Sequence, residues 1–231
     1  MRNLLLLFLF GSMISCQKNG NAVFDIHIQN ADQFDKAWHD LYTIEIYKND
    51  RIFRILEPEE HALSLKSQIK IDSLEDGKYA FVYESIFGDK IKKEIEVDGS
   101  KVYRVNINPD TLNRKTEKSV FGNIKNGAAK LVYKSSGCFH KEEDSLVIIN
   151  KANNYFIRQR NGNIKPIDRK IWSYFVRAEN RIRHIPEDGE CTTKDIYIFY
   201  DKGKTDTIKD GTCYISVWMT LENYLKKNKL E

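Results

Sequence analysis

The chain has 231 residues, with 37 Lys and Arg against 33 Asp and Glu, and a formal charge of +4. This length allows one large domain or two small ones, since domains commonly hold roughly 100–150 residues. Hydrophobic residues make up 41% of the chain and aromatic residues 12%, which excludes a disordered protein. The near balance of charges argues against a dedicated nucleic-acid-binding protein, so we expect no nucleic-acid partner.

The first fifteen residues have the anatomy of a secretory signal peptide. Arg2 supplies a positive charge, and an unbroken apolar run follows from residue 4 to residue 10. The apolar stretch is too short to span a bilayer, which needs roughly 20 residues. We therefore expect residues 1–15 to be removed on export.

Ser15, directly before Cys16, resembles the lipobox of bacterial lipoproteins, although Met13 stands where Leu is usual. The resemblance implies cleavage before Cys16 and attachment of three fatty chains, palmitate among them, to this cysteine. Residues 16–22 then form a polar, lipidated tether. A residue other than Asp after the cysteine implies the outer membrane, and we expect its periplasm-facing leaflet because no acidic run follows Cys16. Two alternatives stay open, an ordinary signal peptide with an incidental cysteine and an uncleaved anchor.

Residues 23–109 predict an antiparallel β-sandwich. Apolar and polar residues alternate in short segments at 23–28, 43–47, 68–71, 79–83, 94–97 and 102–107. Turn-forming pairs stand between them, such as Asn49-Asp50, Asp76-Gly77 and Gly88-Asp89. Short strands separated by turns every ten residues or so are typical of a sandwich or barrel.

Three details refine this expectation. Asp98-Gly99 lies between two apolar segments and predicts a hairpin. Phe34, Trp38 and Leu41 have helical spacing and predict a short helix or a packed loop. The stretch Leu-Glu-Asp-Gly-Lys-Tyr at 74–79, followed by strands, resembles prealbumin-like or carboxypeptidase-regulatory-like sandwiches, which are common in exported bacterial proteins.

The polar stretch 110–118 follows Asn108-Pro109 and predicts an interdomain linker. Residues 119–231 then predict an α+β domain. Strands are expected at 120–124, 128–133, 146–150, 155–159, 196–200 and 205–208, and helices at 168–182 and from about 217. The first two strands flank Asn126-Gly127, a hairpin signal. The order of four strands, helix, two strands and helix favours two helices on one face of a sheet.

Each predicted helix has an apolar face and a charged face. The first helix has Asp168 as a candidate N-cap. Its apolar face is formed by Ile171, Trp172, Phe175 and Val176. A stripe of Lys170, Arg177 and Arg181 is expected to be solvated, with contact to anionic lipid headgroups as the alternative. The last helix turns Trp218, Leu221 and Leu225 inward and carries a Glu222–Lys226 pair outside.

This second half is similar in element order to small α+β domains of uncharacterised bacterial envelope lipoproteins. In those domains a Cys-Phe motif, present here as Cys138-Phe139, precedes two strands, a helix, a hairpin and a closing helix. The usual second cysteine and proline are absent here, because residues 140–143 read His-Lys-Glu-Glu. The resemblance implies an architecture and no activity.

Cys138 and His140 are the pair most suggestive of chemistry. The strong motifs for phosphate binding, serine hydrolysis, zinc proteolysis and dithiol redox are missing from the sequence. On one strand, a spacing of two puts both side chains on the same face, where a base lowers the thiol pKa. The preceding Ser-Ser-Gly favours a loop instead, with Cys138 packed as a small hydrophobe and His140 solvated. We therefore assign no catalytic residue.

Metal sites are weighed in the same way. Cys138, His140, Cys191 and Cys213 are four soft ligand types for zinc, but no two are spaced as a zinc knuckle. His140-Lys141-Glu142 matches the His-x-Glu of zinc deaminases without the Pro-Cys-x-x-Cys that must follow. Acidic residues could provide acid–base pairs or calcium ligands, although a solvated surface is the favoured interpretation: Glu142, Glu143, Asp144, Glu187, Asp188 and Glu190. We expect no metal and no cofactor.

Alternating aromatic residues carry two interpretations as well. They stack on sugars in some binding proteins, but in strands they usually fill a core, which is the interpretation we favour. The residues concerned are Tyr79, Phe81, Tyr83, Tyr197 and Phe199.

Cys191 and Cys213 are predicted to form a disulfide. A three-residue loop at 201–203 pairs Tyr200 with Lys204. The same register, continued outward, sets Cys191 opposite Cys213. Cysteines of an oxidising compartment tend to pair, and this pairing leaves Cys138 free. The rival arrangement joins Cys138 to one of the other two.

Together these features favour a non-catalytic binding or structural module in the bacterial envelope. Its link to the membrane is the lipid on Cys16, and its partner is an unknown protein or glycan. The alternative is a thiol-dependent envelope enzyme that uses Cys138 and His140.

Overall fold

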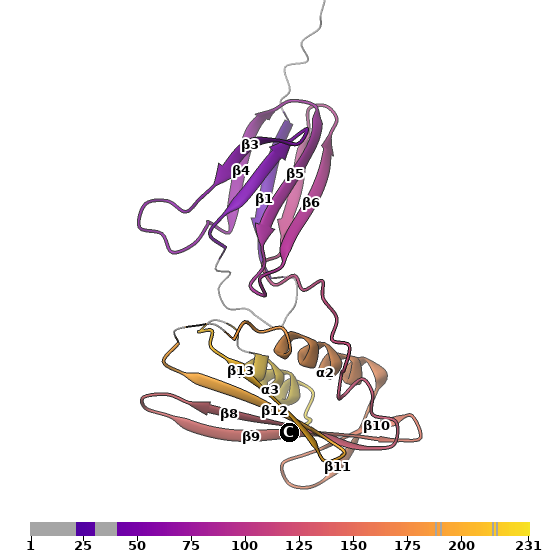
Figure 1. The fold of residues 1–231 in the computed structure, drawn as a ribbon. Helices are drawn as coiled ribbons and strands as arrows, with labels where there is room; N and C mark the ends of the chain where they lie inside the picture. The colour runs from indigo at the N-terminus through magenta and orange to yellow at the C-terminus, as the bar shows by residue number, and fades with distance from the viewer. Residues whose placement is uncertain (1–21, 31–40, 188, 190, 214, 216) are drawn as a thin grey trace, which may run out of the picture.

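A computed structural model of the chain describes residues 22–30, 41–187, 189, 191–213, 215 and 217–231. Cys16 and most of the predicted 34–41 element therefore lie outside the described residues. Within them the protein is mostly β, with both described helices late in the chain (Figure 1). This confirms the predicted fold class, a β-sandwich followed by an α+β region.

The N-terminal half consists of two sheets packed face to face. One sheet has the order β4-β1-β7 and the other the order β3-β2-β5-β6. Their strands are β1 (Ala22–Ile28), β2 (Ile44–Lys48), β3 (Arg51–Leu56), β4 (Gln68–Leu74), β5 (Gly77–Glu84), β6 (Lys90–Val97) and β7 (Val102–Ile107). Alternate side chains of β1 are buried, as the period of two predicts.

Aromatic rings fill the space between these sheets. Phe24 on β1 meets Tyr79, Phe81 and Tyr103 edge to face, with ring centroids 5.1, 5.0 and 6.2 Å apart. Tyr79, Phe81 and Tyr83 all belong to this core. The core interpretation of these alternating aromatics is therefore correct, and they offer no sugar-stacking surface.

The sandwich differs from the sequence expectations in one wrong hairpin and one strand that was not predicted. Asp98-Gly99 does not close a hairpin, because β6 pairs with β5 while β7 pairs in parallel with β1 in the other sheet. The chain turns between sheets there, and the Tyr103 hydroxyl bonds both the Asp98 side chain and its backbone N–H. β3 was not predicted, since Arg-Ile-Phe-Arg-Ile-Leu does not alternate and lies exposed at a sheet edge.

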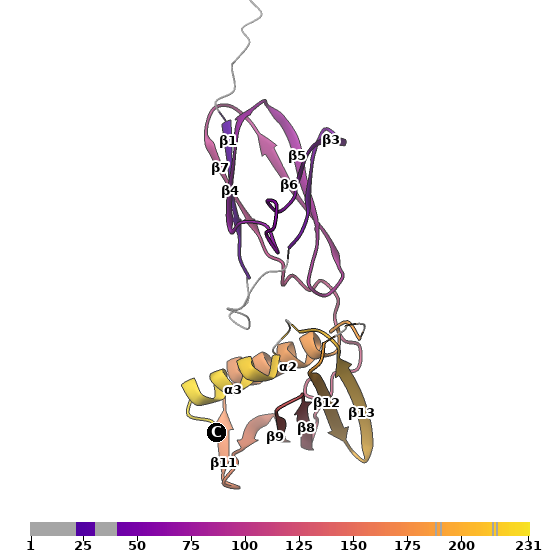
Figure 2. The same cartoon turned by 90° about the vertical axis from the view of Figure 1, so that its left-hand side faces the viewer.

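The C-terminal half is a six-stranded antiparallel sheet with helices on one face (Figure 2). The strand order is β11-β10-β9-β8-β12-β13. Its elements are β8 (Gly127–Ser136), β9 (Lys141–Lys151), β10 (Asn154–Arg158), β11 (Ile164–Ile167), α2 (Arg169–Ile182), β12 (Lys194–Asp201), β13 (Lys204–Asp210) and α3 (Val217–Lys227).

The predicted element order is correct, but one strand of it is displaced. Residues 120–124 form turns rather than a strand. The reason is Glu179 of α2, whose buried carboxylate accepts the backbone N–H groups of Val120 and Phe121 at 2.6 and 2.8 Å. The fourth strand is β11 instead, an edge strand that tolerates Pro166.

Helix α2 begins where the sequence predicts. The Asp168 carboxylate accepts the backbone N–H of Ile171 at 2.7 Å, as an N-cap residue does. Phe175 and Ile182 face the core, together with Tyr174 and Ala178. Arg181 is the exception to the predicted charged stripe and is described with the junction below.

Helix α3 also packs as predicted, with Trp218, Leu221 and Leu225 buried. Glu222 lies on its outer side, where it accepts from Arg160 at 2.9 Å. The aromatic rings of Tyr174 and Tyr224 stack between α2 and α3, with centroids 3.5 Å apart.

The β12–β13 hairpin differs from the predicted one by a single residue. Asp201 pairs with Lys204 and Tyr197 with Ile208, so the loop has two residues rather than three. Lys202 and Gly203 both have positive φ, 47° and 79°, which is the geometry of a type I′ turn. The predicted pair Tyr200–Lys204 is therefore wrong, because Tyr200 pairs with Thr205.

The sandwich and the α+β region meet through the β5–β6 turn. Phe87 in this turn is buried in the core of the α+β region rather than in its own sandwich. Arg181 of α2 lies 4.9 Å from the Phe87 ring centroid and 3.7 Å from the Asp110 carboxylate. Arg181 and Asp110 are both buried, so the expectation that Arg181 is solvated is wrong.

The predicted linker 110–118 is bonded on both sides. Arg114 pairs with Asp89 of the sandwich at 2.6 Å and donates to the Phe87 carbonyl. Thr116 N–H donates to the Asn180 side chain of α2, which in turn donates to the Arg114 carbonyl. That residues 110–118 separate two folding units stays a prediction.

Candidate functional site

Cys138 and His140 lie at the tip of the β8–β9 hairpin. Gly137 N–H donates to the His140 carbonyl at 3.0 Å, so the segment is a tight turn and not a strand. Cys138 is unpaired and exposed, and Phe139 beside it is fully exposed. His140 Nε2 lies 2.8 Å from the Ser135 hydroxyl. Among the described residues no hydrogen bond joins the thiol to a base, so the tip lacks the contact that a thiol nucleophile requires.

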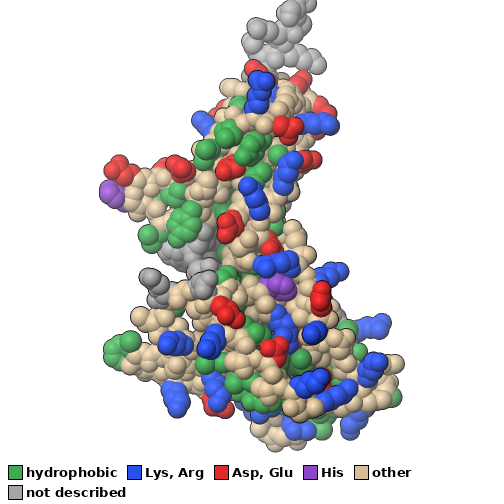
Figure 3. All heavy atoms as spheres, in the orientation of Figure 1, with side chains coloured by type: hydrophobic (Ala, Val, Ile, Leu, Met, Phe, Trp, Pro, Cys, Tyr) green, Lys and Arg blue, Asp and Glu red, His purple; other side chains and the backbone are tan. Residues whose placement is uncertain are grey.

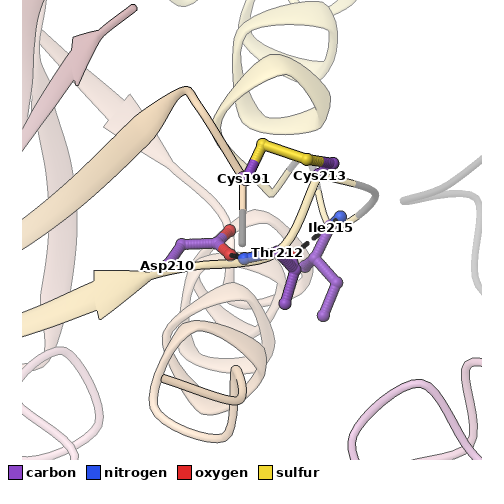
Figure 4. The surroundings of a disulfide bond; sticks show 5 residues. All are labelled: Cys191, Asp210, Thr212, Cys213 and Ile215. Atoms are coloured by element: carbon purple, nitrogen blue, oxygen red, sulfur yellow. Dashed lines mark hydrogen bonds between the residues drawn. A yellow bond between two sulfur atoms is a disulfide. The ribbon is translucent and has the colours of Figure 1, made fainter. Parts of the chain in front are cut away.

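Cys191 and Cys213 form the predicted disulfide, with Cα atoms 5.3 Å apart (Figure 4). The bond lies beyond the paired ends of β12 and β13, where Cys191 N–H donates to the Gly211 carbonyl at 3.3 Å. Gly189 passes so close that a Cβ on it would lie 1.9 Å from the Gly211 oxygen. Two of the four soft ligands considered for zinc are thus consumed by the disulfide.

The acidic residues considered as an acid–base or calcium site are dispersed. Glu142, Glu143 and Asp144 lie on β9, where Glu143 pairs with Lys134 at 3.0 Å and Asp144 with Arg160. Glu187 is exposed, and Asp188 and Glu190 lie outside the described residues. Over the described part of the chain, no group of three or more His, Cys, Asp or Glu side chains is arranged to hold a metal ion.

The face of the six-stranded sheet turned away from α2 and α3 has a different character. We call it the open face. Alternation along the strands assigns to it the even-numbered residues of β8, β10, β11 and β12 and the odd-numbered residues of β9 and β13. Val132 and Ile149 on this face are buried, yet they belong to neither hydrophobic core. Their neighbours Val147 and Ile198 are half-buried, so the centre of the open face is apolar.

Positive charge surrounds this apolar centre. The paired strands place these cationic side chains on the open face: Lys130, Lys134, Lys141, Arg158, Lys194 and Lys209. The acidic side chain that alternation places among them is Glu143, which Lys134 neutralises. Lys and Arg side chains also predominate over the α+β region in Figure 3. An apolar centre with a basic rim is the combination expected of a surface that binds an acidic partner.

Sequence reasoning did not find the open face. The signal was present in β8, where Lys130 and Lys134 flank Val132 at spacings of two, and the core residues fall between them. Strand periodicity alone does not say which side helices cover, so the face emerges only from the assembled sheet.

The helix-facing side of the same sheet carries a buried polar group near the disulfide. Asp195 and Asp210 are paired residues of β12 and β13. Burial raises the pKa of Asp210 to about 6, against hydrogen bonds from Thr212 that lower it. Burial also raises the pKa of Tyr197, and the nearby Asp210 and Asp195 raise it further.

No helix in the described part of the chain is long and apolar enough to cross a membrane. Cys16 lies outside that part, so its lipidation stays a prediction.

No family model matches the sequence, and no curated protein matches it. Among solved structures, a DUF3823 family protein from Bacteroides uniformis ATCC 8492 aligns over 84% of this chain and 98% of its own, at 8% identity and a TM-score of 0.24. A TM-score this low does not establish a common fold, and we draw no argument from it.

Proposed function

We propose that the protein is a lipid-anchored, non-catalytic module of the bacterial envelope, and that its open face binds an acidic protein. The observation that carries the proposal is the apolar centre of the open face within its basic rim. The anchor is supported by the signal-peptide pattern and by Ser15-Cys16.

The geometry of the sandwich favours a soluble partner over the membrane surface. β1 begins at Ala22, directly after the predicted tether, and it runs parallel to β7, whose end at Ile107 leads to the α+β region. The first residue of β1 therefore lies at the end of the sandwich opposite the α+β region (Figure 1). The seven residues of β1 span about 23 Å at roughly 3.3 Å per residue. This length holds the open face away from the lipid headgroups to which the anchor attaches.

The composition of the open face favours a protein over a glycan. Sugar-binding surfaces present several exposed aromatic rings. Among the described residues of the open face, Tyr200 alone is an exposed aromatic side chain, with 40% of its surface exposed. The centre consists instead of aliphatic Val132, Val147, Ile149 and Ile198. Aliphatic centres with charged rims are typical of protein interfaces.

A charge-reversal experiment tests the binding role. The variant Lys130→Glu, Arg158→Glu, Lys209→Glu inverts three exposed positions of the open face. The matched control, Lys170→Glu, Lys226→Glu, Lys227→Glu, inverts three exposed positions on the helices. The probe is poly-L-glutamate, applied to the detergent-solubilised full-length protein at low salt. We expect at least tenfold weaker binding for the open-face variant and little change for the control. Equal losses in both variants would mean charge attraction without a site.

The identity of the occupant is tested in cells with a photo-crosslinking residue at Tyr200. We expect a discrete protein adduct that disappears in the open-face variant and in the presence of excess poly-L-glutamate. A crosslinker at Met219, exposed on α3, is the control position. A glycan or lipid adduct at Tyr200 would overturn the protein partner.

The anchor has its own test. Replacing Cys16 with Ala should release the protein from the membrane fraction after a carbonate wash, because the lipid is its proposed attachment. If the Cys16→Ala protein stays in the membrane fraction, the lipoprotein part of the proposal is wrong, while the open-face experiments still stand.

A further inference from the structure

The helix-facing side of the six-stranded sheet ends in a row of oxygen-bearing side chains. Ser135, Asp195 and Asp210 occupy neighbouring positions on β8, β12 and β13. Side chains directly opposite each other in an antiparallel pair have Cβ atoms about 4.5–5.5 Å apart. Ser135 and Asp210 are buried, and Asp195 is half-buried. Two carboxylates therefore stand side by side at the edge of the core.

These carboxylates have unused oxygens. Asp210 Oδ1 accepts the N–H and the hydroxyl of Thr212, both at 2.7 Å (Figure 4). Asp210 Oδ2 and Asp195 Oδ1 are buried and accept no hydrogen bond. A buried acceptor without a partner costs about 1–3 kcal/mol, and more when it is charged. The pair thus lacks a positive partner.

A third oxygen points to the same conclusion. Tyr197 lies two residues after Asp195 on the same side of β12 and is fully buried. Asp210 and Asp195 raise the pKa of its hydroxyl and the backbone of Trp218 lowers it, and no side chain of the described residues forms a hydrogen bond with this buried hydroxyl. Among the described residues of β8, β12 and β13, no Lys or Arg lies next to this row on the helix-facing side, because Lys134, Lys194 and Lys209 alternate onto the open face. The missing partner is therefore not supplied by the surrounding strands.

We propose that Asp195 and Asp210 bind a divalent cation, calcium in the first place, with the Tyr197 hydroxyl as a neutral ligand. All three donors are hard oxygens, which suit Ca²⁺ rather than soft metals. Two carboxylates match the charge of one divalent ion, which removes the repulsion between them. The hydrogen bonds from Thr212 hold the Asp210 carboxylate in position, as groups around metal ligands commonly do.

The location gives the ion a mechanical role. β13 ends at Asp210. The chain then passes Cys213, which is bonded to Cys191, before α3 begins at Val217. An ion between Asp195 and Asp210 links the end of β13 to β12, next to the Cys191–Cys213 disulfide. The ion and the disulfide would both restrain the segment between β13 and α3. This site lies on the opposite side of the sheet from the open face, so the inference is independent of the proposed function.

Terbium luminescence tests the site directly, since Tb³⁺ replaces Ca²⁺ and is excited through nearby Tyr and Trp side chains. The sample is full-length protein freed of metal with chelator. We expect sensitised emission that Ca²⁺ displaces, and at least a tenfold loss of emission in both Asp195→Asn and Asp210→Asn. Glu59→Gln with Glu60→Gln, which alters two exposed acidic residues between β3 and β4 of the sandwich, is the matched control and should keep its emission.

A second variant and a second measurement guard against misfolding. Tyr197→Phe keeps both carboxylates and should weaken Tb³⁺ binding several-fold. Saturating Ca²⁺ should raise the Tm of the wild type and leave that of Asp210→Asn unchanged, because only a folded-state ligand stabilises. Absence of sensitised emission, or equal losses in the Glu59/Glu60 control, would overturn the proposal. A third outcome would also contradict the proposal. If Ca²⁺ did not raise the Tm of the wild type and Asp210→Asn were more stable than the wild type, the two carboxylates would share a proton instead of binding an ion.

Discussion

The two halves of the molecule bury their sheets in different ways. The sandwich covers each sheet with the other, so its apolar exposure falls at an edge, where Ile52, Phe53 and Ile55 of β3 lie 61, 42 and 48% exposed. The six-stranded sheet is covered by helices on one side, and on its other side buried and half-buried aliphatic residues lie among cationic side chains. A sheet edge presents unpaired backbone groups to a partner and selects little by charge. A sheet face presents a larger contact area and a pattern of charges. In our proposal the second half binds the partner and the first half sets the distance between the anchor and the open face.

The same contrast holds for the polar groups inside. The sandwich core is built of aromatic and aliphatic contacts around Phe24. The α+β region buries Glu179, Arg181, Asp110 and Asp210. Buried charges specify one arrangement of their partners, because any displacement leaves a group unpaired. The α+β region should therefore be the more sensitive half to loss of a single polar group.

The largest expected effect tests that difference at Glu179. Its carboxylate accepts from Ser119, Val120 and Phe121 and pairs with Arg183 at 2.7 Å. Glu179→Ala leaves buried donors unpaired and should reduce the free energy of unfolding by about 3–5 kcal/mol. Trp172 and Trp218, both in the α+β region, report this loss in urea unfolding by fluorescence. Glu179→Gln, which keeps a carbonyl acceptor, should cost less. A cost below about 1 kcal/mol for Glu179→Ala would contradict the assigned role.

The next effect concerns the join between the two halves. Phe87→Ala removes a sandwich-borne ring from the α+β core and should cost about 3 kcal/mol, at the lower end for a buried Phe. The loss of the ring also exposes residues 110–118, which are hydrogen-bonded to both halves. Limited proteolysis should therefore cut this segment first, and faster than in the wild type. Phe53→Ala, on the exposed edge, is the matched control and should leave the cleavage rate unchanged. Cleavage elsewhere at an unaltered rate would show that Phe87 does not couple the halves.

A comparable effect is expected at the disulfide. Replacing Cys191 and Cys213 with Ser opens a loop with a sequence separation of 22 residues. The chain-entropy relation gives a loss of about 3 kcal/mol. Gly189→Ala should also destabilise this end, because its Cβ meets the Gly211 carbonyl. Thiol counting checks the assignment, since the wild type should show one accessible thiol, Cys138, among the three cysteines after Cys16. An accessible thiol count of three would contradict the bond.

Local patterns predicted much of this fold, and the failures have physical causes. Alternation and the Asp168 cap placed most strands and helix α2, because those signals depend on nearby residues. Asp98-Gly99 misled because a turn sequence does not specify which sheet receives the next strand. The strand expected at 120–124 failed because a distant carboxylate, Glu179, takes its N–H groups. The disulfide was predicted correctly from a register wrong by one residue, since the bond lies beyond the paired strands and tolerates the shift.

The candidate sites were less predictable than the fold. The open face requires knowledge of which sheet side the helices cover. The Asp195–Asp210 pair requires the true β12–β13 register, because the predicted loop sets Asp195 opposite Lys209 instead. Cys138 and His140 attracted attention by residue type alone, and the structure places them at an exposed tip with His140 held by Ser135.

The smallest expected effect sharpens the comparison of edge with face. Ile52→Thr with Ile55→Thr keeps β-branched side chains on an exposed edge strand, so the free energy of unfolding should change by no more than about 0.5 kcal/mol. Binding of poly-L-glutamate should also be unchanged, because these residues lie on the sandwich and carry no charge. The matched change on the face, Ile198→Thr, alters the apolar centre and should reduce crosslinking from Tyr200 while leaving charge unaltered. Urea titration and crosslinking yield measure the two outcomes. If the β3 variant lost the crosslinked adduct and Ile198→Thr kept it, recognition would belong to the edge of the sandwich, and the assignment of recognition to the second half would be wrong.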